Sequence, residues 1–491
     1  MVLLVVILLL LLCLLVRTYL YTKNGRKLDP ELSAKDEYVP DQEMLDEVND
    51  HFRGALRIPS ISHNDPSETD WSQFQKLHDY LKETYPSVFQ TMELELVGGY
   101  SMFLRWKGTD SQRRPIAFLS HLDVVPVEPL SEWTYPPFSA TVADGYIWGR
   151  GTLDMRCQLI TVLESCERLI KAGFTPEEDI YLLFGCNEEV GDLPPGIGAD
   201  RLSEMLKERN IKLDCVIDEG GAITDGSALG VGTRVCAVGV SEKGFASFDI
   251  CATDEGGHSS RPPAHTALGR VCSAAVKIEN NWMKPRLTKP VEKMLDMAAP
   301  YMDNFALRLL MANKWLFRPL LPLIFSKVEV LKPFVQTTTA LTMASASEQD
   351  NVLPQEAHIV MNSRVLPGET IDDVKRHLEE LSSEDNVTIK LFKGNDPSGI
   401  SPSDTVSFAK IDELVQKYYP GTLVVPYIQL GASDSTNYYK VCDNVYRIMP
   451  FYFPYWVTNM GHRADERVPV EALERGVKLF MDFIREYKGE G

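Results

Sequence analysis

The 491-residue chain predicts an α/β fold, in which a doubly wound, mostly parallel sheet is interrupted by an inserted α+β domain of ferredoxin-like type. Two observations lead to this prediction. Short apolar runs typical of buried strands alternate with longer segments of helical periodicity, and this alternation favours a parallel sheet with helices on both faces. The chain also exceeds the roughly 250–300 residues that a single hydrophobic core supports, so at least two domains are expected.

The centre of the sheet is predicted from three apolar runs, at residues 116–120, 180–186 and 214–218. Between the first two runs, residues 155–172 carry apolar side chains at helical spacing, and Gly173 follows as a C-terminal stop signal. Because parallel strands place their carboxyl ends at one edge of the sheet, residues that directly follow these runs are expected to share one site.

The inserted domain is predicted at residues 240–393. Its expected elements are strands at 246–252, 356–365 and 387–392 and helices at 266–279 and 371–381. The doubly wound pattern then resumes with helices at 404–418 and 469–487. We therefore predict a sheet domain split between residues 36–239 and 394–491, with 240–393 inserted as a lid or dimerisation domain.

Composition excludes several classes of protein. A net charge of −19 would repel phosphate backbones, and no basic stripe is present, so nucleic acid is not expected as a partner. Nine cysteines in so long a chain are too few for a disulfide scaffold. No Cys-x-x-Cys spacing occurs, which leaves a cysteine-based zinc site or redox motif without support.

Residues 1–22 are predicted to be a signal anchor or a signal peptide, because residues 2–16 form an unbroken apolar run. No basic segment precedes the run and no small-residue cleavage site follows it, which favours an uncleaved anchor. Two signals disagree on orientation. The positive-inside rule points to the cytoplasm, whereas the sequon at Asn386 points to the lumen. We expect a membrane-anchored or secreted chain with a lumenal or extracellular main domain. The basic residues behind the cytoplasmic alternative are Arg17, Lys23, Arg26 and Lys27.

Histidines and carboxylates gather at the predicted strand ends and turns. Each cluster has an ordinary structural explanation on its own: His121 could be a strand-end histidine bonded by Asp123, and Asp154 could be a helix N-cap. The adjacent carboxylates of Glu188 and Glu189 differ, because they repel one another unless a cation or a proton intervenes. Taken together, the clusters supply what a two-zinc hydrolase needs, namely a bridging carboxylate, a histidine and a carboxylate for each ion, and a general base.

These motifs resemble those of the zinc aminoacylase and carboxypeptidase family of metallopeptidases, across nearly the whole chain after residue 36. Within that family the fatty-acyl-amino acid synthase/hydrolase branch is most similar, followed by the carboxypeptidase S type. The motifs that carry the resemblance are Ser-His-Leu-Asp at 120–123, Gly-Arg-Gly-Thr-Leu-Asp-Met at 149–155, Glu-Glu at 188–189, Asp-Glu-Gly-Gly at 218–221, Gly-His-Ser-Ser at 257–260 and Gly-His-Arg-Ala-Asp-Glu at 461–466.

The resemblance implies two Zn²⁺ ions per chain. Asp154 would bridge them, Glu188 would be the general base, and Asp123 would orient a metal-binding imidazole. The implied metal ligands are His121, Asp154, Glu189, Glu219 and His462. Other branches use an aspartate at the fourth position, which keeps Asp218 open as the alternative to Glu219.

Four further residues are implied to contact substrate. His258 resembles a lid histidine that reaches the active site across a homodimer, although it could be a surface histidine in a turn. Arg364 resembles the arginine that binds the terminal carboxylate of the substrate, and its structural alternative is an edge-strand arginine paired with Glu356. Asn351 and Asp434 are expected to line the same pocket.

The predicted function is a zinc-dependent amidohydrolase that cleaves, and reversibly forms, the amide bond of N-acyl amino acids with long acyl chains. The alternative is a metallo-carboxypeptidase or dipeptidase acting on small peptides, since both substrates present an amide beside a free carboxylate. The apolar stretch 315–325 has three interpretations: the buried face of a helix, a wall for an acyl chain, or an attachment surface on the membrane.

Overall fold

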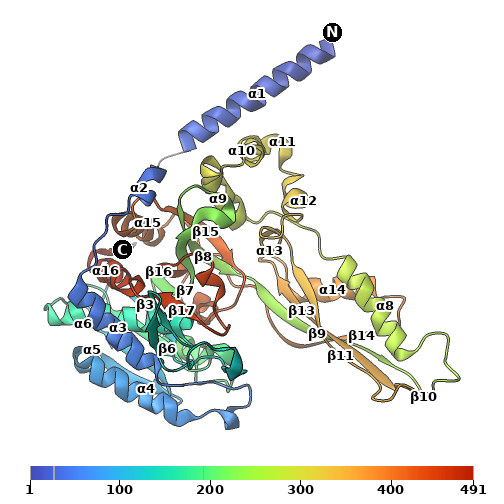
Figure 1. Cartoon of the computed structure of the whole chain (residues 1–491), viewed down its shortest axis with the longest axis horizontal. Helices are drawn as coiled ribbons and strands as arrows, with labels where there is room; N and C mark the ends of the chain where they lie inside the picture. Colours follow the sequence, from blue (N-terminus) through green and yellow to red (C-terminus); the bar gives the residue numbers. More distant parts are fainter. Residues whose placement is uncertain (1, 26–27, 192, 490–491) are drawn as a thin grey trace.

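The computed structural model describes residues 2–25, 28–191 and 193–489, and its centre is a mixed, mostly parallel sheet (Figure 1). The four strands β6, β3, β7 and β16 run parallel to one another, as do β8 and β15, while the remaining pairings are antiparallel. The predicted fold class is therefore confirmed. In spatial order the strands are β1 (Glu93–Val97), β2 (Ser101–Trp106), β6 (Ile180–Gly185), β3 (Ile116–His121), β7 (Cys215–Asp225), β16 (Val445–Tyr452), β8 (Arg234–Glu242) and β15 (Leu423–Gln429).

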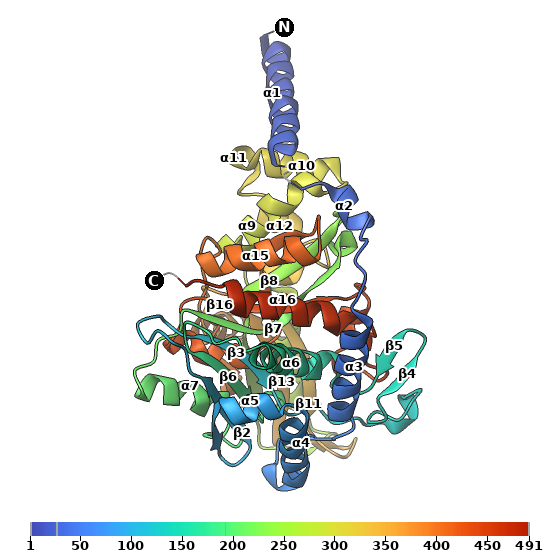
Figure 2. The ribbon, with the colours of Figure 1, turned by 90° about the vertical axis from the view of Figure 1, so that its left-hand side faces the viewer.

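Helices cover both faces of this sheet. Successive strand residues point to opposite faces, and apolar side chains occur on each face. Phe118 of β3 joins the larger core, whereas its neighbour Leu119 joins the core on the opposite face. The larger core lies under α3 (Gln42–Leu56), α4 (Trp71–Thr84), α5 (Pro86–Thr91), α6 (Cys157–Lys171), α15 (Val406–Tyr418) and α16 (Ala472–Glu486), as Figure 2 shows for α6 and α16. The opposite face is covered by α7 (Ala199–Glu208) and the 3-10 segment at 434–440. The helix predicted from residue 155 begins at Cys157.

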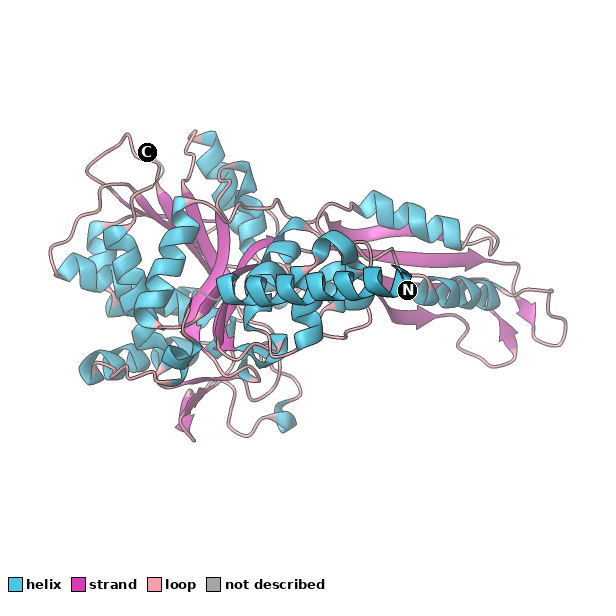
Figure 3. Cartoon of the chain, turned by 90° about the horizontal axis from the view of Figure 1, so that it is seen from above, coloured by secondary structure: helices cyan, strands magenta, loops and turns pink. Residues whose placement is uncertain are grey.

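The second sheet is antiparallel and extends away from the first (Figure 3). Its order is β11 (Thr338–Ser345), β13 (Glu356–Val365), β9 (Gly244–Thr253) and β14 (Thr388–Asn395), and α8 (Ala267–Asn280) and α14 (Ile371–Leu381) pack on it through one core. This is the predicted α+β lid domain with ferredoxin-like strand order. The domain limits given above stay a prediction. The short strands β10 (Gly257–His258) and β12 (Val352–Leu353) pair at its far end.

Between α8 and β11 the chain forms a group of short helices, here called the helical cap (residues 289–335). Met294 and Leu295 of the cap pack against Leu423 and Val425 of β15, so the cap covers one edge of the large sheet. The sequence predicted only an apolar stretch here and not the cap as a unit. The cap contains α9 (Lys289–Ala298), α10 (Phe305–Ala312), α11 (Lys314–Phe317), α12 (Leu321–Phe325) and α13 (Lys332–Val335).

The N-terminal apolar run forms one helix, α1 (Val2–Gly25), which is long and apolar enough to cross a membrane by length and composition. It points away from the body, and only Leu14 and Thr18 are buried along it. Of the predicted basic residues after the run, Arg26 and Lys27 lie outside the described residues, as does Met1. The other elements are α2 (Pro30–Ala34) and a small sheet of β17 (Arg467–Pro469), β5 (Tyr146–Trp148) and β4 (Thr141–Ala143).

Candidate metal centre

His121 and Asp154 face each other at the carboxyl end of the sheet. His121 ends β3, is 1 % exposed, and places its Nε2 atom 2.9 Å from Asp154 Oδ1. Its Nδ1 atom lies 3.0 Å from the backbone oxygen of Asp123 and 3.4 Å from Oδ1 of the same residue. One ring nitrogen is therefore held by Asp123 while the other is directed at Asp154, which is the arrangement of a metal-binding imidazole with a carboxylate behind it.

The other oxygen of Asp154 faces a second histidine. His462 Nε2 lies 3.1 Å from Asp154 Oδ2 and 2.9 Å from Glu189 Oε2. The two carboxylate oxygens of Asp154 thus each meet a different imidazole, one from β3 and one from the loop before β17. Two groups of potential ligand atoms, each within 4.8 Å, therefore share this aspartate: His121–Asp154–Glu219 and Asp154–Glu189–His462.

The adjacent carboxylates of Glu219 and Asp218 point in different directions. Glu219 Oε1 lies 3.6 Å from His121 Nε2, and its side chain lines the cavity described below. Asp218 is buried on the other face of the strand, where Oδ2 accepts a hydrogen bond of 2.9 Å from the backbone nitrogen of Ser435. Successive side chains of a strand point in opposite directions, so only one of the two can reach the histidine. The geometry thus favours Glu219 over Asp218.

Glu188 lies beside the cluster on a short 3-10 segment, with a carboxylate oxygen within 4.8 Å of the His121 ring. Its backbone nitrogen donates to Asp123 Oδ1 at 3.2 Å, and that of Glu189 donates to Oδ2 of the same residue at 3.1 Å. Asp123 also accepts a 2.6 Å hydrogen bond from Ser62. Asp123 therefore positions both His121 and the Glu188–Glu189 pair, a second contact that the sequence did not predict.

The crowded carboxylates have strongly shifted pKa values. Burial raises the pKa of Glu188 and of Glu219 well above their usual range, and burial together with the Asp154 charge raises the pKa of Glu189 to about 7. Hydrogen bonds to Asp154 and Glu189 raise the pKa of His462 to about 10. Burial is the largest cause for the three glutamates, and nearby negative charges add to each shift. A positively charged group between the carboxylates would relieve their repulsion.

The cluster fits divalent metal ions on two grounds. Its donors are imidazole nitrogens and carboxylate oxygens, which suit divalent ions of the first transition row. In addition, Glu189 Oε1 is buried and has no hydrogen-bond partner among the described residues, although a buried carboxylate oxygen is costly to leave unpaired. A metal ion at this oxygen would satisfy it.

Two buried ion pairs around the cluster were not predicted from the sequence. Glu466, the last residue of the Gly-His-Arg-Ala-Asp-Glu motif, is 0 % exposed and bonds Arg150 at 2.6 Å. Its Oε1 atom also accepts from the backbone nitrogens of Leu153 and Asp154, at 2.7 and 3.2 Å. Glu466 therefore fixes the loop that presents Asp154. Its place in a motif with His462 was the only available signal.

The second pair joins Glu242 of β8 to Arg447 of β16, both buried. Glu242 Oε2 accepts from the backbone nitrogen of Ser433 and the hydroxyl of Thr436, each at 3.2 Å. This pair organises the turn that contains Asp434. Asp434 is 6 % exposed, and its charge contributes to raising the pKa of Glu188, so it lies near the cluster although it does not line the cavity.

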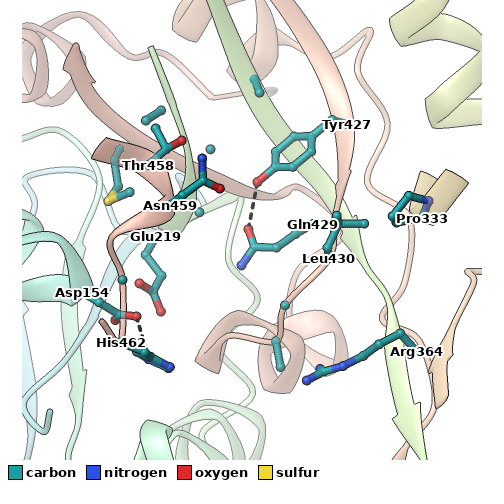
Figure 4. A pocket seen from close by; sticks show the side chains of 18 of the residues that line it. Asp154, Glu219, Pro333, Arg364, Tyr427, Gln429, Leu430, Thr458, Asn459 and His462 are labelled. Atoms are coloured by element: carbon teal, nitrogen blue, oxygen red, sulfur yellow. Dashed lines mark hydrogen bonds and ion pairs between the residues drawn. The ribbon is translucent and has the colours of Figure 1, made fainter. Parts of the chain in front are cut away.

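A cavity of about 1100 Å³ opens from the cluster toward the inserted domain. Figure 4 shows Arg364 across this space from Asp154, Glu219 and His462, with its guanidinium directed into the opening. The proposed pairing of Arg364 with Glu356 is wrong, because both lie on β13 about 26 Å apart and β13 is an inner strand. Besides the cluster and Arg364, the cavity has an apolar wall. This wall includes Val235, Met294, Val330, Phe334, Val425 and Met449.

His258 and Asn351 do not line this cavity. Both are exposed and lie next to each other at the far end of the inserted domain, where β10 pairs with β12 and Ser259 N donates to the Asn351 oxygen at 3.0 Å. Figure 1 shows β10 at the end of the domain that points away from the large sheet. Within one chain the structure thus brings together the metal cluster and Arg364, but not His258 or Asn351.

A split α/β domain with a histidine–carboxylate cluster at its strand ends, joined to an antiparallel lid, defines a metal-dependent hydrolase. Residues 117–486 match Peptidase family M20/M25/M40, and the chain belongs to this family of metallopeptidases and amidohydrolases, whose metal centre is dinuclear.

Related proteins and a solved structure agree with this family assignment. The chain is 32% identical over 476 residues to the N-fatty-acyl-amino acid synthase/hydrolase PM20D1 of Xenopus tropicalis, covering 96% of this chain and 91% of that protein. It is 32% identical over 449 residues to the probable carboxypeptidase S-like 2 of Dictyostelium discoideum, covering 89% and 85%. The M20 family metallo-carboxypeptidase Sso-CP2 from Sulfolobus solfataricus shares the fold, with a TM-score of 0.67 at 18% identity over 88% of this chain and 97% of that one.

Proposed function

We propose that this protein is a zinc-dependent amidohydrolase that cleaves, and in reverse forms, the amide bond of N-acyl amino acids with long acyl chains. The observation that carries the proposal is that one cavity joins three features: the metal-ligand cluster, Arg364 and an apolar wall. An N-acyl amino acid has the same three parts, namely an amide, a carboxylate and a hydrocarbon chain.

Two zinc ions would be held by the side chains of the cluster. His121, Asp154 and Glu219 would hold one, and Asp154, Glu189 and His462 the other, because these are the two groups of ligand atoms within 4.8 Å that share Asp154. When bound, the ions supply Lewis acidity to the amide carbonyl and to the attacking water. Asp123 keeps His121 oriented by accepting at its Nδ1 side.

Glu188 would move the proton. It takes a proton from the attacking water, the water oxygen forms a bond to the amide carbon, and Glu188 then gives the proton to the departing nitrogen as the carbon–nitrogen bond breaks. The raised pKa of the buried Glu188 carboxyl supports this assignment, because a proton acceptor that must also donate needs to hold its proton more firmly than an exposed glutamate does. Running the same steps backwards joins a free acid to an amino acid.

Substrate contacts would come from both domains. Arg364 binds the free carboxylate, for which its forked guanidinium is suited. We assign His258 and Asn351 to the active site of a second subunit, where His258 would polarise the carbonyl, because both residues are exposed at the end of the lid and away from their own cavity. Asp434 would contribute indirectly, because its negative charge helps to raise the pKa of Glu188.

The apolar wall favours an acyl chain over a second amino acid. Its hydrophobic residues, which include the six named above, extend from the large sheet to the helical cap, and the charged residues Asp225 and Glu329 line the same cavity. A dipeptide would place its free amino group there, at a cost in desolvation. The carboxypeptidase alternative stays open through the relatives of the carboxypeptidase S type.

A substrate panel tests the proposal directly. With zinc supplied, kcat/KM should rise with acyl length for N-acyl amino acids and stay lower for dipeptides of similar size. Roughly tenfold or more per few methylene groups is expected, at about 0.8 kcal/mol for each buried CH₂. A preference for dipeptides, or no dependence on chain length, would instead support the carboxypeptidase alternative.

We further propose that the catalytic domain faces the lumen or the outside of the cell, either anchored through α1 or secreted. Asn386 of the sequon is exposed, at the turn before β14, so it is accessible to a glycosyltransferase. Treatment with an N-glycosidase should lower the apparent mass of the native protein but not of the Asn386→Gln variant. An unchanged mass of the native protein would favour the cytoplasmic orientation.

A further inference from the structure

The outer side of the helical cap exposes large hydrophobic side chains. In a water-soluble surface such residues occur singly, whereas here they follow one another along α10, α11, α12 and the next turn. The exposed fractions are Phe305 50%, Trp315 58%, Leu316 39%, Leu320 50%, Leu323 54%, Val328 42% and Val330 46%. We call these residues the cap patch.

The cap patch lies beside the base of α1, which is joined to the cap by specific bonds. Asn313, between α10 and α11, is 0 % exposed, and its Nδ2 atom lies 3.2 Å from the Leu14 oxygen and 3.2 Å from Thr18 Oγ1. The hydroxyl of Tyr21 donates to the Asp296 oxygen at 2.8 Å. Figure 2 shows α10 and α11 on the two sides of the lower end of α1.

The position of these contacts along α1 sets the depth of the cap. Leu14 belongs to the apolar run 2–16, so the cap already touches the helix within the segment expected in hydrocarbon. At about 1.5 Å of rise per residue, the cap reaches about 5 Å into the hydrocarbon if Arg17 marks the membrane surface, and about 10 Å if Tyr21 does. Interfacial helices are buried by about 5–10 Å, which is the same depth.

The charges of the cap are consistent with this placement. Lys314 pairs with Glu292 at 3.2 Å and also with Asp296, and Arg318 pairs with Glu292 at 3.1 Å. The cations of Lys314 in α11 and of Arg318 directly after it therefore have their counter-ions within the cap itself. Lys327 and Glu329 are exposed beside Val328 and Val330 at one end of the cap patch, whereas Trp315, Leu316, Leu320 and Leu323 are all apolar. Tryptophan is enriched where protein meets the lipid headgroups.

We propose that α1 stays attached as a membrane anchor and that the cap patch rests in the interface of the lipid bilayer. Cleavage of α1 would remove two of the acceptors of the buried Asn313 amide, which is costly, so the docked helix is part of the folded protein. A bilayer is chosen over a second copy of the chain because the patch lies beside a helix that is long and apolar enough to cross a membrane.

The same proposal gives the patch a role at the active site. Val330 is both 46% exposed in the patch and part of the cavity wall, together with Pro333 and Phe334 of α13. The apolar arm of the cavity therefore reaches the surface at the edge of the patch. A hydrocarbon chain dissolved in the bilayer could enter the cavity there without crossing water.

Trp315 provides the test of docking. The full chain is reconstituted in phosphatidylcholine vesicles, with lipids brominated near the headgroup end of the acyl chains as contact quenchers of tryptophan fluorescence. The wild-type protein should be quenched, and Trp315→Phe should lose most of that quenching. Trp456→Phe is the matched control, because Trp456 is 44% exposed on the catalytic domain and should contribute none of it.

Two outcomes would overturn the proposal. If Trp315→Phe keeps the full quenching, or if Trp315 in vesicles stays open to aqueous iodide, the patch faces water. If Trp315 is protected from iodide but is not quenched by brominated lipid, a second protein copy covers it instead. Both readouts use folded, membrane-inserted protein, and the Trp→Phe change is small enough to preserve the fold.

A kinetic measurement extends the test and rests on the proposed function. Leu320→Asp/Leu323→Asp places charge on the patch outside the cavity lining, so kcat/KM for a long-chain N-acyl amino acid in vesicles should fall roughly tenfold or more. A short-chain substrate in solution should be turned over as before. If the variant matched the wild type on the long-chain substrate as well as on the short-chain one, delivery through the membrane would be refuted. An enzyme without activity on any N-acyl amino acid would refute the proposed function, while the quenching result would still decide on docking.

Discussion

The metal-ligand cluster and the far end of the inserted domain present functional residues in opposite ways. In the cluster, His121 is 1% exposed and bonded on both ring nitrogens, so its direction is fixed before any ligand arrives. At the end of the lid, His258 is exposed, and its ring accepts one hydrogen bond of 3.1 Å from the nearby Ser260 nitrogen. One chain thus brings together the candidate metal ligands, but it does not bring His258 to them.

The cause lies in topology. The carboxyl ends of β3, β6 and β7 meet at one edge of a sheet, so residues far apart in sequence converge without further adjustment. The far end of the lid, where β10 pairs with β12, lies away from these strand ends, so we expect its exposed side chains to serve a site in another subunit. The comparison predicts that variants in the cluster act within their own chain, whereas variants at the lid end act on a partner.

The largest effect is expected from Glu188→Gln. The amide can occupy the same space but cannot carry a proton, so kcat should fall by about 10²–10⁴-fold while two zinc ions per chain remain bound. The neighbouring Glu189→Gln provides the matched contrast, because loss of a ligand should lower the zinc content. Metal analysis of both purified variants checks the pair. If Glu188→Gln loses zinc and Glu189→Gln keeps it, the two roles are reversed.

His258→Ala should lower kcat by about 10²–10³-fold, the usual cost of losing a group that stabilises the developing oxyanion, without changing zinc content. His265→Ala, an exposed histidine in the same loop, is the control and should be silent. The decisive measurement mixes inactive Glu188→Gln chains with inactive His258→Ala chains under exchange. Random pairing gives one intact site in half of the dimers, so activity should recover to about a quarter of the wild-type value. No recovery at any mixing ratio would contradict a shared site.

Arg364→Ala should have a smaller effect, which depends on the substrate. A hydrogen bond to a charged group is worth about 1.5–3 kcal/mol, so kcat/KM for a free carboxylate should fall about 10- to 150-fold. The methyl ester of the same substrate should be nearly unaffected, and Arg364→Lys should recover part of the loss because it keeps the charge but not the fork. Equal losses on acid and ester would make Arg364 a structural residue.

Much of the fold could be predicted because its signals are local. The strand 356–365 and the helix 371–381 have the predicted limits, since alternating side chains and the capping box of Thr370 and Asp373 mark their ends. The helical cap could not be predicted. Its helices are only four to ten residues long, contain prolines, and are held together by packing on β15 rather than by their own periodicity.

The candidate site shows the same division. The ligand residues could be proposed because each lies in a short motif of histidines and carboxylates at a predicted strand end or turn, but the roles of Glu466 and Glu242 could not. Both are buried carboxylates that hold loops through backbone nitrogens. Their partners lie about 300 and 190 positions away in sequence, as the separations of 313 for Leu153 and 191 for Ser433 show. No spacing rule links residues that far apart.

The smallest effect concerns Lys243, which lies between β8 of the large sheet and β9 of the lid. It is 3% exposed, and its Nζ atom donates to the backbone oxygens of Pro333 and Gln336 at 3.0 and 2.9 Å, so it holds α13 against the point where the two regions join. Burial lowers the pKa of Lys243 to about 7 from its usual 10.5. In that pH range the unfolded chain binds the proton more readily than the folded chain does, so this residue makes the protein more stable as the pH rises from about 7 to 10.5, by up to about 1.4 kcal/mol per pH unit. Lys243→Met should remove this dependence while leaving zinc content unchanged. Thermal unfolding should therefore show that the stability of the wild type, relative to that of the variant, is higher at pH 9 than at pH 7. If the unfolding temperatures of the two proteins changed by the same amount between pH 7 and pH 9, the ammonium group of Lys243 would be as well solvated as that of a surface lysine. The junction between the lid and the large sheet would then be open to water.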